Sequence, residues 1–425
     1  MGDEVASTAA ARKSIGYAEA RERVLSAAQP LPPERIALGD ARGRPLHREV
    51  TAPHGLPPFR NSAMDGIAVR SVDLAQASEA DPVTLTVIEV LPAGRVAARA
   101  IGPRETIRIM TGAMVPEGAD AIVPAEEFER AVGAGLGRVR VSRPVEPGEH
   151  VREAGRDLAA GETAVPAGRA LSPHDLGLLA ALGEAEVTVG RRPQVAILST
   201  GDELLAVDAP LTPGGIRDSN LPMLVALLEE FGARVASARR IGDDPDQVKL
   251  ALRSALDVAD VVITIGGVSA GEFDPVKVAI AGFPPIELWR VAMRPGQPQA
   301  FGTPEGRLFF GLPGNPASVA CVFEALVRPA LRKLQGFTVL DRPRLPARAT
   351  ADIESRRGRT DFVRVTLERR KGEWWATPAG EQTSGHLSPQ SRAHALLVVP
   401  AAAERIARGE TGDALLLRWP EETSQ

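Results

Sequence analysis

The chain has 425 residues, which at about 150 residues per domain corresponds to roughly two to four domains. Its 50 Lys and Arg residues nearly balance its 54 Asp and Glu residues, and only 4% of its residues are aromatic. This composition lacks the excess of cations and the stacking surfaces with which proteins bind bulk nucleic acid, so no nucleic-acid partner is expected. A single cysteine, Cys321, excludes an internal disulfide, a zinc site of several cysteines and an iron–sulfur cluster on this chain.

The beginning of the chain predicts neither secretion nor a membrane span. No apolar run approaches the ~18 residues that a spanning helix needs. The first residues also lack the apolar core of a signal peptide. We therefore expect a cytoplasmic protein without a membrane partner, in which residues 1–13 form a disordered tail. An amphipathic helix is expected from Tyr17 to Gln29, ending at Pro30.

From residue 34 to about residue 190, short β-branched segments alternate with Gly/Pro turns, which is typical of one or two small β-rich domains. The predicted strands include VTLTVIEV (83–90), TIRIMTG (106–112), DAIVP (120–124) and RVRVS (138–142). One short helix is expected at 173–182, with Ser172 as its N-cap and Pro173 at its first position.

From residue 193 to about residue 335, apolar segments of strand length alternate with amphipathic helices. The expected strands are 195–200, 233–241, 260–265 and two short ones before the last helix, and the expected helices are 221–232, 245–257, 275–281 and 316–334. This alternation predicts a doubly wound, mostly parallel α/β sheet. The chain then returns to predicted strands, including a hairpin with Lys371 and Gly372 at its turn, so a small β-barrel is expected at the C-terminus.

Ligands of a doubly wound sheet bind beyond the carboxyl ends of its strands, so the loops that leave those ends form the candidate site. These loops carry three carboxylates, Glu203, Asp243 and Asp274. Oxygen ligands of this kind suit a divalent cation. Nearby cations, Arg290, Arg294 and Lys277, suggest a bound oxyanion, and ordinary surface salt bridges are the alternative.

Two glycine-containing loops add a possible anion site. In Pro313-Gly314-Asn315-Pro316, the asparagine is expected to cap the following helix and leave free N–H groups at its N-terminus for an anion, although an ordinary capped helix start fits equally well. Gly266 and Gly267 permit positive φ angles, which would bring a phosphate against the main chain.

Together these segments resemble the molybdopterin molybdenumtransferases, the family of bacterial MoeA and the gephyrin E domain. The resemblance runs in order through nearly the whole chain. The matching strings are PPFRNSAMDGIAVR (57–70), RIMTGAMVPEGADAIVP (108–124), VREAGRDLAAGE (151–162), STGDEL (199–204), GGVSAGEFD (266–274), RPGQP (294–298) and GLPGNPAS (311–318).

The resemblance implies a step in molybdenum cofactor biosynthesis. Molybdenum from molybdate would enter adenylylated molybdopterin with release of AMP, in a Mg²⁺-dependent reaction. The upstream partner would be a molybdopterin adenylyltransferase. The resemblance also implies a homodimer whose active cleft combines the α/β domain of one subunit with the β-rich domains of the other.

The resemblance further implies a domain division and a set of site residues. Its domains are an α/β domain (14–32 with 192–340), a linking β/α domain (33–51 with 160–191), a β-rich domain (52–159) and a C-terminal barrel (341–425). The positions that match functional family positions are Asp65, Thr111, Arg152, Asp157, Glu203, Asp243, Asp274, Pro313, Pro316, Arg364 and Ser384. The strand-end loops add the substrate-binding candidates Gly266, Gly267, Ser269, Lys277, Gly314 and Asn315.

Roles follow for the charged members of this set. Glu203, Asp243 and Asp274 would serve Mg²⁺ and phosphate chemistry, and Asp65 would enter from the partner subunit. Molybdate and the pterin phosphate would be held by Arg152, Arg290, Arg294, Arg364 and Ser384. The chain departs from the family pattern in carrying Arg290 and Arg294 where lysine is usual, and Gln297 in place of the lysine of a PGKP turn.

Two other functions fit parts of the sequence. One is a molybdopterin adenylyltransferase-like enzyme, whose single domain resembles the α/β region but needs neither the NSAMDG segment nor the β-rich flanks. The other is a non-catalytic dimeric scaffold or paralogue of the family, against which the intact carboxylates argue.

Overall fold

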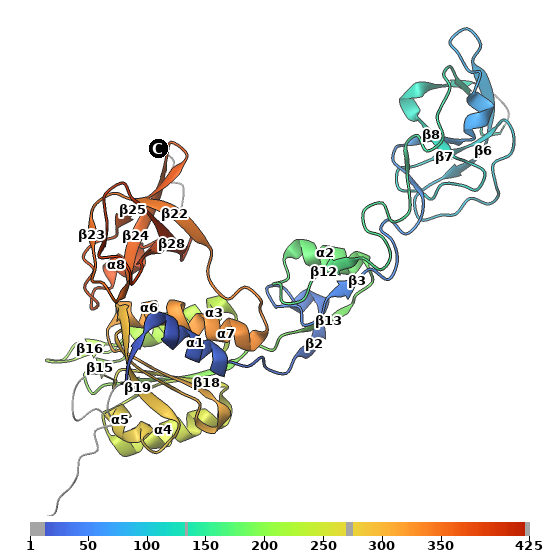
Figure 1. Cartoon of the computed structure of the whole chain (residues 1–425). Coiled ribbons are helices and arrows are strands. Elements are labelled where there is room, and N and C mark those ends of the chain that lie inside the picture. Colours follow the sequence, from blue (N-terminus) through green and yellow to red (C-terminus); the bar gives the residue numbers. More distant parts are fainter. Residues whose placement is uncertain (1–12, 132–134, 269–274, 421–425) are drawn as a thin grey trace, which may run out of the picture.

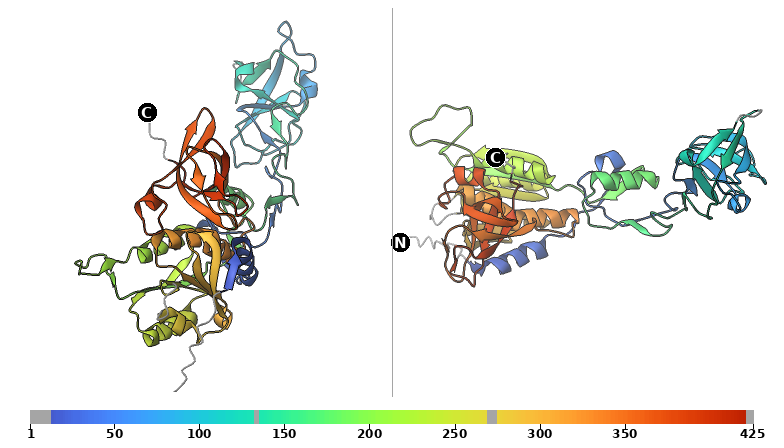
Figure 2. Two further views of the ribbon diagram at one scale, coloured as in Figure 1. Left: turned by 60° about the vertical axis from the view of Figure 1, so that its left-hand side comes forward. Right: turned by 90° about the horizontal axis from the view of Figure 1, so that it is seen from above.

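The computed structural model describes residues 13–131, 135–268 and 275–420 (Figure 1). Its elements form an elongated molecule of four parts (Figures 1 and 2). An α/β sheet and a C-terminal β-barrel lie side by side at one end, a small α+β part follows, and a six-stranded sheet lies at the other end. Within the described ranges, no helix combines the length and the apolar character that crossing a membrane requires.

The α/β sheet has the strand order β17-β14-β18-β21-β20-β19, with β1 beside β19. Its strands are β1 (Lys13–Gly16), β14 (Gln194–Thr200), β17 (Arg234–Ile241), β18 (Val261–Ile265), β19 (Ile286–Arg294), β20 (Pro298–Gly302) and β21 (Leu308–Leu312). The central strands read as continuous apolar runs because both of their faces are covered. The predicted mostly parallel sheet is confirmed, and β20 is its antiparallel member.

Helices cover both faces of this sheet, so two hydrophobic cores form. On one face lie α1 (Tyr17–Ala27), α3 (Asn220–Phe231), α6 (Pro316–Val322) and α7 (Arg328–Gln335), and on the other lie α4 (Pro245–Val258) and α5 (Pro275–Ile280). The helix predicted over 316–334 contains a π-helical turn at Phe323–Val327. Pro329 has no N–H for the carbonyl four residues earlier, so the regular α-helical bond is missing there.

The C-terminal part is a closed five-stranded barrel, as predicted. Its strands run in the order β24-β25-β22-β28-β26, and β26 pairs with β24 to close it. The bounds are β22 (Arg344–Ala349), β24 (Thr360–Arg370), β25 (Glu373–Pro378), β26 (Ala395–Val399) and β28 (Thr411–Leu416), with the short β23 (Ile353–Glu354), β27 (Arg405–Ile406) and α8 (Ser388–Arg392) at its margin. Lys371 and Gly372 form the predicted hairpin turn, both with positive φ.

A short pair, β15 (Leu204–Leu205) and β16 (Ile216–Arg217), follows β14, and most of the other elements form the small α+β part and the distal β-rich part. The small one contains β2 (Glu34–Ala37), β3 (Val50–Thr51), β12 (Thr163–Val165), α2 (Pro173–Ala181) and β13 (Glu186–Val189). Ser172 caps α2 as predicted, through a reciprocal capping box with Asp175. The distal sheet contains β5 (Gly66–Val69), β6 (Val83–Leu91), β7 (Glu105–Ile109), β8 (Ala121–Pro124), β9 (Phe128–Ala131) and β10 (Arg138–Val141), with β4 (Asn61–Ser62) paired to β11 (Val151–Arg152) beside it.

Phe309, in the middle of β21, is fully buried against α4 and α5. We expect Phe309→Ala to lower the free energy of unfolding by about 3–5 kcal/mol, because it leaves a cavity in this core. The matched control is Val278→Ala on α5, whose side chain is exposed and whose loss should cost less than about 0.5 kcal/mol. Urea denaturation followed by circular dichroism measures both, and equal losses would contradict the packing described.

Candidate active site

The carboxyl ends of the parallel strands meet at one edge of the α/β sheet, and a cavity of about 1020 Å³ lies there. We call it the rim cavity. Most of its lining comes from the loops after β14, β17, β18 and β21, which are far apart in sequence, and Gly385 and Leu387 of the barrel add to it. The sequence-predicted residues that line it are Glu203, Asp243, Gly266, Gly267, Pro313, Gly314, Asn315 and Pro316.

Two neighbouring loops of the rim cavity hold each other in place. The Asp202 N–H donates to the Asp243 carboxylate at 3.2 Å, and the Asp243 N–H donates to the Asp202 carboxylate at 3.0 Å. Asp243 and Glu203 therefore line the cavity from two loops that are fixed relative to each other. Asp202 was not among the sequence candidates, because only the contact between the two loops reveals its role.

The paired glycines after β18 are required by the backbone. Gly266 and Gly267 have φ angles of 86° and 67°, which disfavour residues with a side chain. A Cβ atom at Gly266 would also lie 2.8 Å from the Thr200 carbonyl oxygen. The predicted positive φ angles are confirmed, and they leave the main chain of this loop open to the cavity.

The asparagine of the Pro-Gly-Asn-Pro loop does not cap its helix as predicted. Asn315 occupies the N-cap position, but its side chain makes no hydrogen bond to the helix. Its amide donates instead to Ser384 Oγ at 2.9 Å. The Ala317 N–H, predicted to be free for an anion, donates to the Ser384 carbonyl oxygen at 3.1 Å. The barrel thus uses the helix terminus as its docking point, a contact between domains that sequence spacing does not reveal.

A second cavity of about 430 Å³ adjoins the first, since Pro298, Pro313 and Asn315 line both. We call it the Arg294 cavity. Its polar lining includes Arg294, Gln297, Ser318, Arg359 and Ser384. The Arg359 guanidinium is held by both oxygens of the buried Asp361, at 2.7 and 2.9 Å. Sequence reasoning missed Arg359, although it lies only five residues before Arg364 in the same segment.

Arg364 lines neither cavity, and its contact with molybdate or the pterin phosphate stays a prediction. Its residue surface is only 1% exposed, and burial lowers the pKa of its guanidinium. The guanidinium donates to the carbonyl oxygens of Glu381, Thr383 and His386 at 3.0–3.2 Å. These donors therefore bind the barrel loop 381–386. Ser384 of this loop lines the Arg294 cavity.

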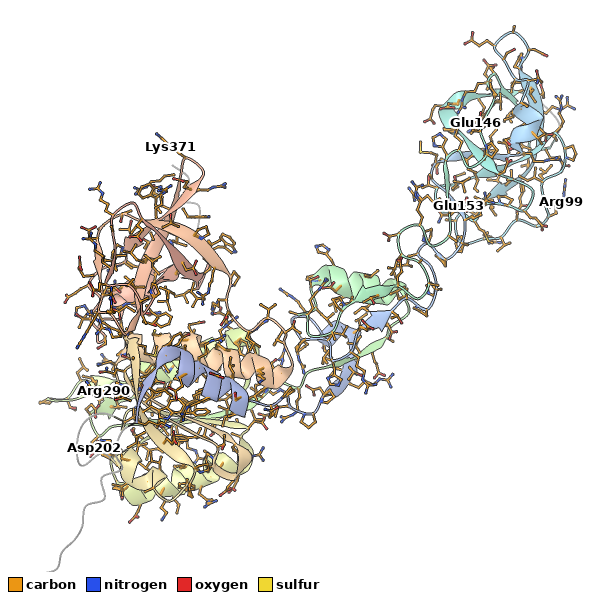
Figure 3. All side chains as sticks on the ribbon, in the orientation of Figure 1. Arg99, Glu146, Glu153, Asp202, Arg290 and Lys371 are labelled. Carbon is orange, nitrogen blue, oxygen red and sulfur yellow. The ribbon has the colours of Figure 1, made fainter. Side chains whose placement is uncertain are left out.

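Other predicted residues lie elsewhere. Arg290 is exposed on β19 (Figure 3) and stands four residues, roughly 13 Å, from Arg294 on the same face of that strand. Neither Arg290 nor Lys277 lines the two cavities. Ser269 and Asp274 lie outside the described residues.

Asp65 and Thr111 lie on the distal β-rich part, at the far end of the molecule from the rim cavity (Figures 1 and 2). The N–H and the hydroxyl of Thr111 both donate to one oxygen of Asp65 at 2.7 Å. These hydrogen bonds, first that of the N–H, hold the pKa of the exposed Asp65 carboxyl below its usual range. Arg152 and Asp157 are also exposed in this region, where Figure 3 labels the neighbouring Glu153. One chain therefore does not bring Asp65 to the carboxylates of the rim cavity.

Fold and cavities together define a multidomain protein built around a doubly wound α/β domain, with its candidate site at the carboxyl ends of the parallel strands. Three family models match the chain: the MoeA N-terminal region (domains I and II) over residues 15–183, a probable molybdopterin-binding domain over 196–333, and the MoeA C-terminal region (domain IV) over 346–417.

Curated proteins and a solved structure agree with these models. Molybdopterin molybdenumtransferase 2 of Mycobacterium tuberculosis is 41% identical, with 89% of this chain and 93% of that protein covered. Molybdopterin molybdenumtransferase of Bacillus subtilis is 35% identical, with 96% and 97% covered. The crystal structure of the molybdopterin biosynthesis MoeA protein from Pyrococcus horikoshii superposes with a TM-score of 0.81 at 30% identity, covering 95% of this chain and 100% of that one. The chain belongs to the molybdopterin molybdenumtransferase family.

We expect Arg364→Met to loosen the barrel loop 381–386, because it removes the donors for several loop carbonyls. Hydrogen exchange of the amides in this loop should accelerate by about tenfold or more. The matched control is Arg369→Met, an exposed arginine on the same strand, which should leave the exchange of the loop unchanged. Unaltered exchange in Arg364→Met would show that the loop does not depend on this guanidinium.

Proposed function

We propose that this chain inserts molybdenum from molybdate into adenylylated molybdopterin and releases AMP. The observation that carries the proposal is the pair of adjoining cavities, one bordered by carboxylates and the other by guanidinium groups and a hydroxyl. The first suits phosphate chemistry with a divalent cation, and the second suits a tetrahedral oxyanion. Their shared wall would bring the dithiolene end of the substrate close to molybdate.

Mg²⁺ fits the donor set of the rim cavity. No cluster of three His, Cys, Asp or Glu side chains that could hold a metal is present among the described residues, so an all-protein cage is not formed by them. Mg²⁺ is usually bound through one or two carboxylates together with substrate phosphates and water. Glu203 and Asp243 would supply the carboxylates. When bound, the ion would neutralise charge on the phosphate oxygens as the link to AMP is cleaved.

Molybdate would occupy the Arg294 cavity. Arg294 and Arg359 supply charged donors, and Asp361 holds Arg359 in a fixed orientation. The Ser384 hydroxyl lies at the same cavity because Arg364 and Asn315 hold its loop. Arg364 would thus act as a positioning residue.

A second copy of the chain would supply Asp65. Three large apolar side chains in the same segments are exposed on the distal part, Phe59, Met64 and Met114. Such a surface around an ionised carboxylate suits a contact with another protein surface better than contact with water. In a symmetric homodimer, the distal part of each subunit would complete the rim cavity of the other.

The substrate also implies a preceding reaction. Because the pterin must arrive with AMP attached, an adenylyltransferase must act before this enzyme, and we propose it as the upstream partner. The proposal places both in the cytoplasm, where nucleotide-activated metabolites are made.

Glu203→Gln removes a negative charge from the rim cavity while keeping the size of the side chain. We expect AMP release to fall at least about 100-fold, because a charged ligand of the proposed Mg²⁺ is lost. AMP is measured chromatographically after incubation with adenylylated molybdopterin, molybdate and Mg²⁺. Asp257→Asn, an exposed carboxylate on α4 outside both cavities, is the control and should retain full activity. Unchanged turnover in Glu203→Gln would refute its role.

A further inference from the structure

A third cavity, of about 470 Å³, lies beside α7, where the chain passes from the α/β sheet to the barrel. We call it the Arg332 cavity. Four arginines line it: Arg328 and Arg332 from α7, Arg342 from the connection to β22, and Arg344 at the start of β22. One carboxylate, Asp341, completes the charged lining. It shares no lining residue with the rim cavity or the Arg294 cavity.

The carboxylates nearby do not serve these arginines equally. The buried Glu324 accepts two hydrogen bonds from Arg342, both at 2.8 Å, but lies 3.8 Å from Arg328. Asp341 is paired with Arg21 of α1 at 2.8 Å. Arg328 donates to the Leu340 carbonyl oxygen at 3.2 Å, but its ion pair with Glu324 is long because the short hydrogen bonds of that carboxylate go to Arg342.

Arg332 has no carboxylate within 4.0 Å in the part of the chain that the structure describes. Its Nε donates to the Val339 carbonyl oxygen at 2.6 Å, and its guanidinium lies 3.8 Å from the ring centre of Phe337. These contacts fix the plane of the guanidinium, but they leave its positive charge without a counter-charge.

Arg328 is the more buried of the two, with 10% of its side chain exposed. Burial lowers the pKa of Arg328 to about 10, although the nearby Glu324 acts to raise it. Burial also lowers the pKa of Arg332. Both directions mean that the charged form is poorly compensated in this place. A bound anion would offset that cost, and guanidinium forks match the oxygens of a tetrahedral oxyanion.

We propose that the Arg332 cavity binds the phosphate group of a small molecule. Arg328 and Arg332 bind the phosphate oxygens, and Arg342, held by Glu324 and 3.6 Å from Glu230, forms a fixed wall of the site. The volume leaves room for an organic group beyond the phosphate, since it falls within the range of small-molecule sites. A bound phosphate would stabilise the connection between the α/β sheet and the barrel, because it would contact arginines on both sides of it.

The test measures phosphate binding in a background that lacks the proposed molybdate contact. Isothermal titration is carried out with the full-length Arg294→Ala protein and two ligands, inorganic phosphate and glycerol 3-phosphate. The same titrations follow for Arg294→Ala combined with Arg332→Ala. The matched control combines Arg294→Ala with Arg253→Ala, which removes an exposed arginine that also covers a phenylalanine ring, Phe283, but lies on α4.

We expect the Arg294→Ala protein to bind at least one of the two ligands, and Arg332→Ala to weaken that binding about tenfold or more. The Arg253→Ala control should bind as tightly as the background, and Arg332→Lys should recover part of the affinity. Tighter binding of glycerol 3-phosphate would assign the site to esterified phosphate, and tighter binding of inorganic phosphate to the free ion. Absence of binding by the Arg294→Ala protein, or equal affinity after Arg332→Ala, would overturn the proposal without touching the proposed function.

Discussion

The candidate site depends on one buried guanidinium and the loop that it holds. Arg364 donates to three carbonyl oxygens of the barrel loop 381–386, and this loop then contacts the start of α6 through Ser384. Since charge-assisted hydrogen bonds in a buried place are costly to leave unmade, the loop has one favoured arrangement. The barrel and the α/β sheet are thereby joined at the wall between the rim cavity and the Arg294 cavity. As a result, the two adjoining cavities combine the carboxylates of Glu203 and Asp243 with the guanidinium groups of Arg294 and Arg359 and the hydroxyl of Ser384. These residues are up to about 180 positions apart in the chain.

The elongated shape imposes a second constraint. The ionised form of Asp65 is stabilised, because Thr111 donates two hydrogen bonds to its carboxylate. It nevertheless lies at the opposite end of the chain from the rim cavity (Figure 1). The role proposed for Asp65 would therefore need a second copy of the chain, and the exposed apolar side chains in the same segments support the proposed contact.

Much of this fold follows from local sequence patterns. The buried strands β14, β18 and β21 read as mainly apolar segments, and Ser172 with Pro173 marks the start of α2. Because parallel strands end at one edge, the sequence also predicted that Glu203 and Asp243 would face a common cavity. These features depend on neighbours in the chain or on general rules for parallel sheets.

The rest depends on contacts between distant segments. β1 has one buried residue, Ile15, and exists because it pairs with β19. The sequence predicts Asn315 as a helix cap, but its side-chain amide donates to Ser384 of the barrel instead. Arg364 reads as a ligand-binding arginine, whereas its position inside the barrel turns its donors toward carbonyl groups. Arg359 reaches the Arg294 cavity only because β24 begins beside the end of β19. No pattern within a single segment carries this information.

The proposed homodimer, in which two chains build each active site, is tested most directly by a mixed dimer. Asp65→Asn and Glu203→Gln chains, each inactive alone, are co-expressed with different tags, and the heterodimer is purified through both. In this heterodimer one site combines the intact Glu203 of one chain with the intact Asp65 of the other, while the second site carries both changes. We predict that AMP release returns to about half of the wild-type rate per dimer. A heterodimer as inactive as its parents, or an Asp65→Asn homodimer with full activity, would contradict the account.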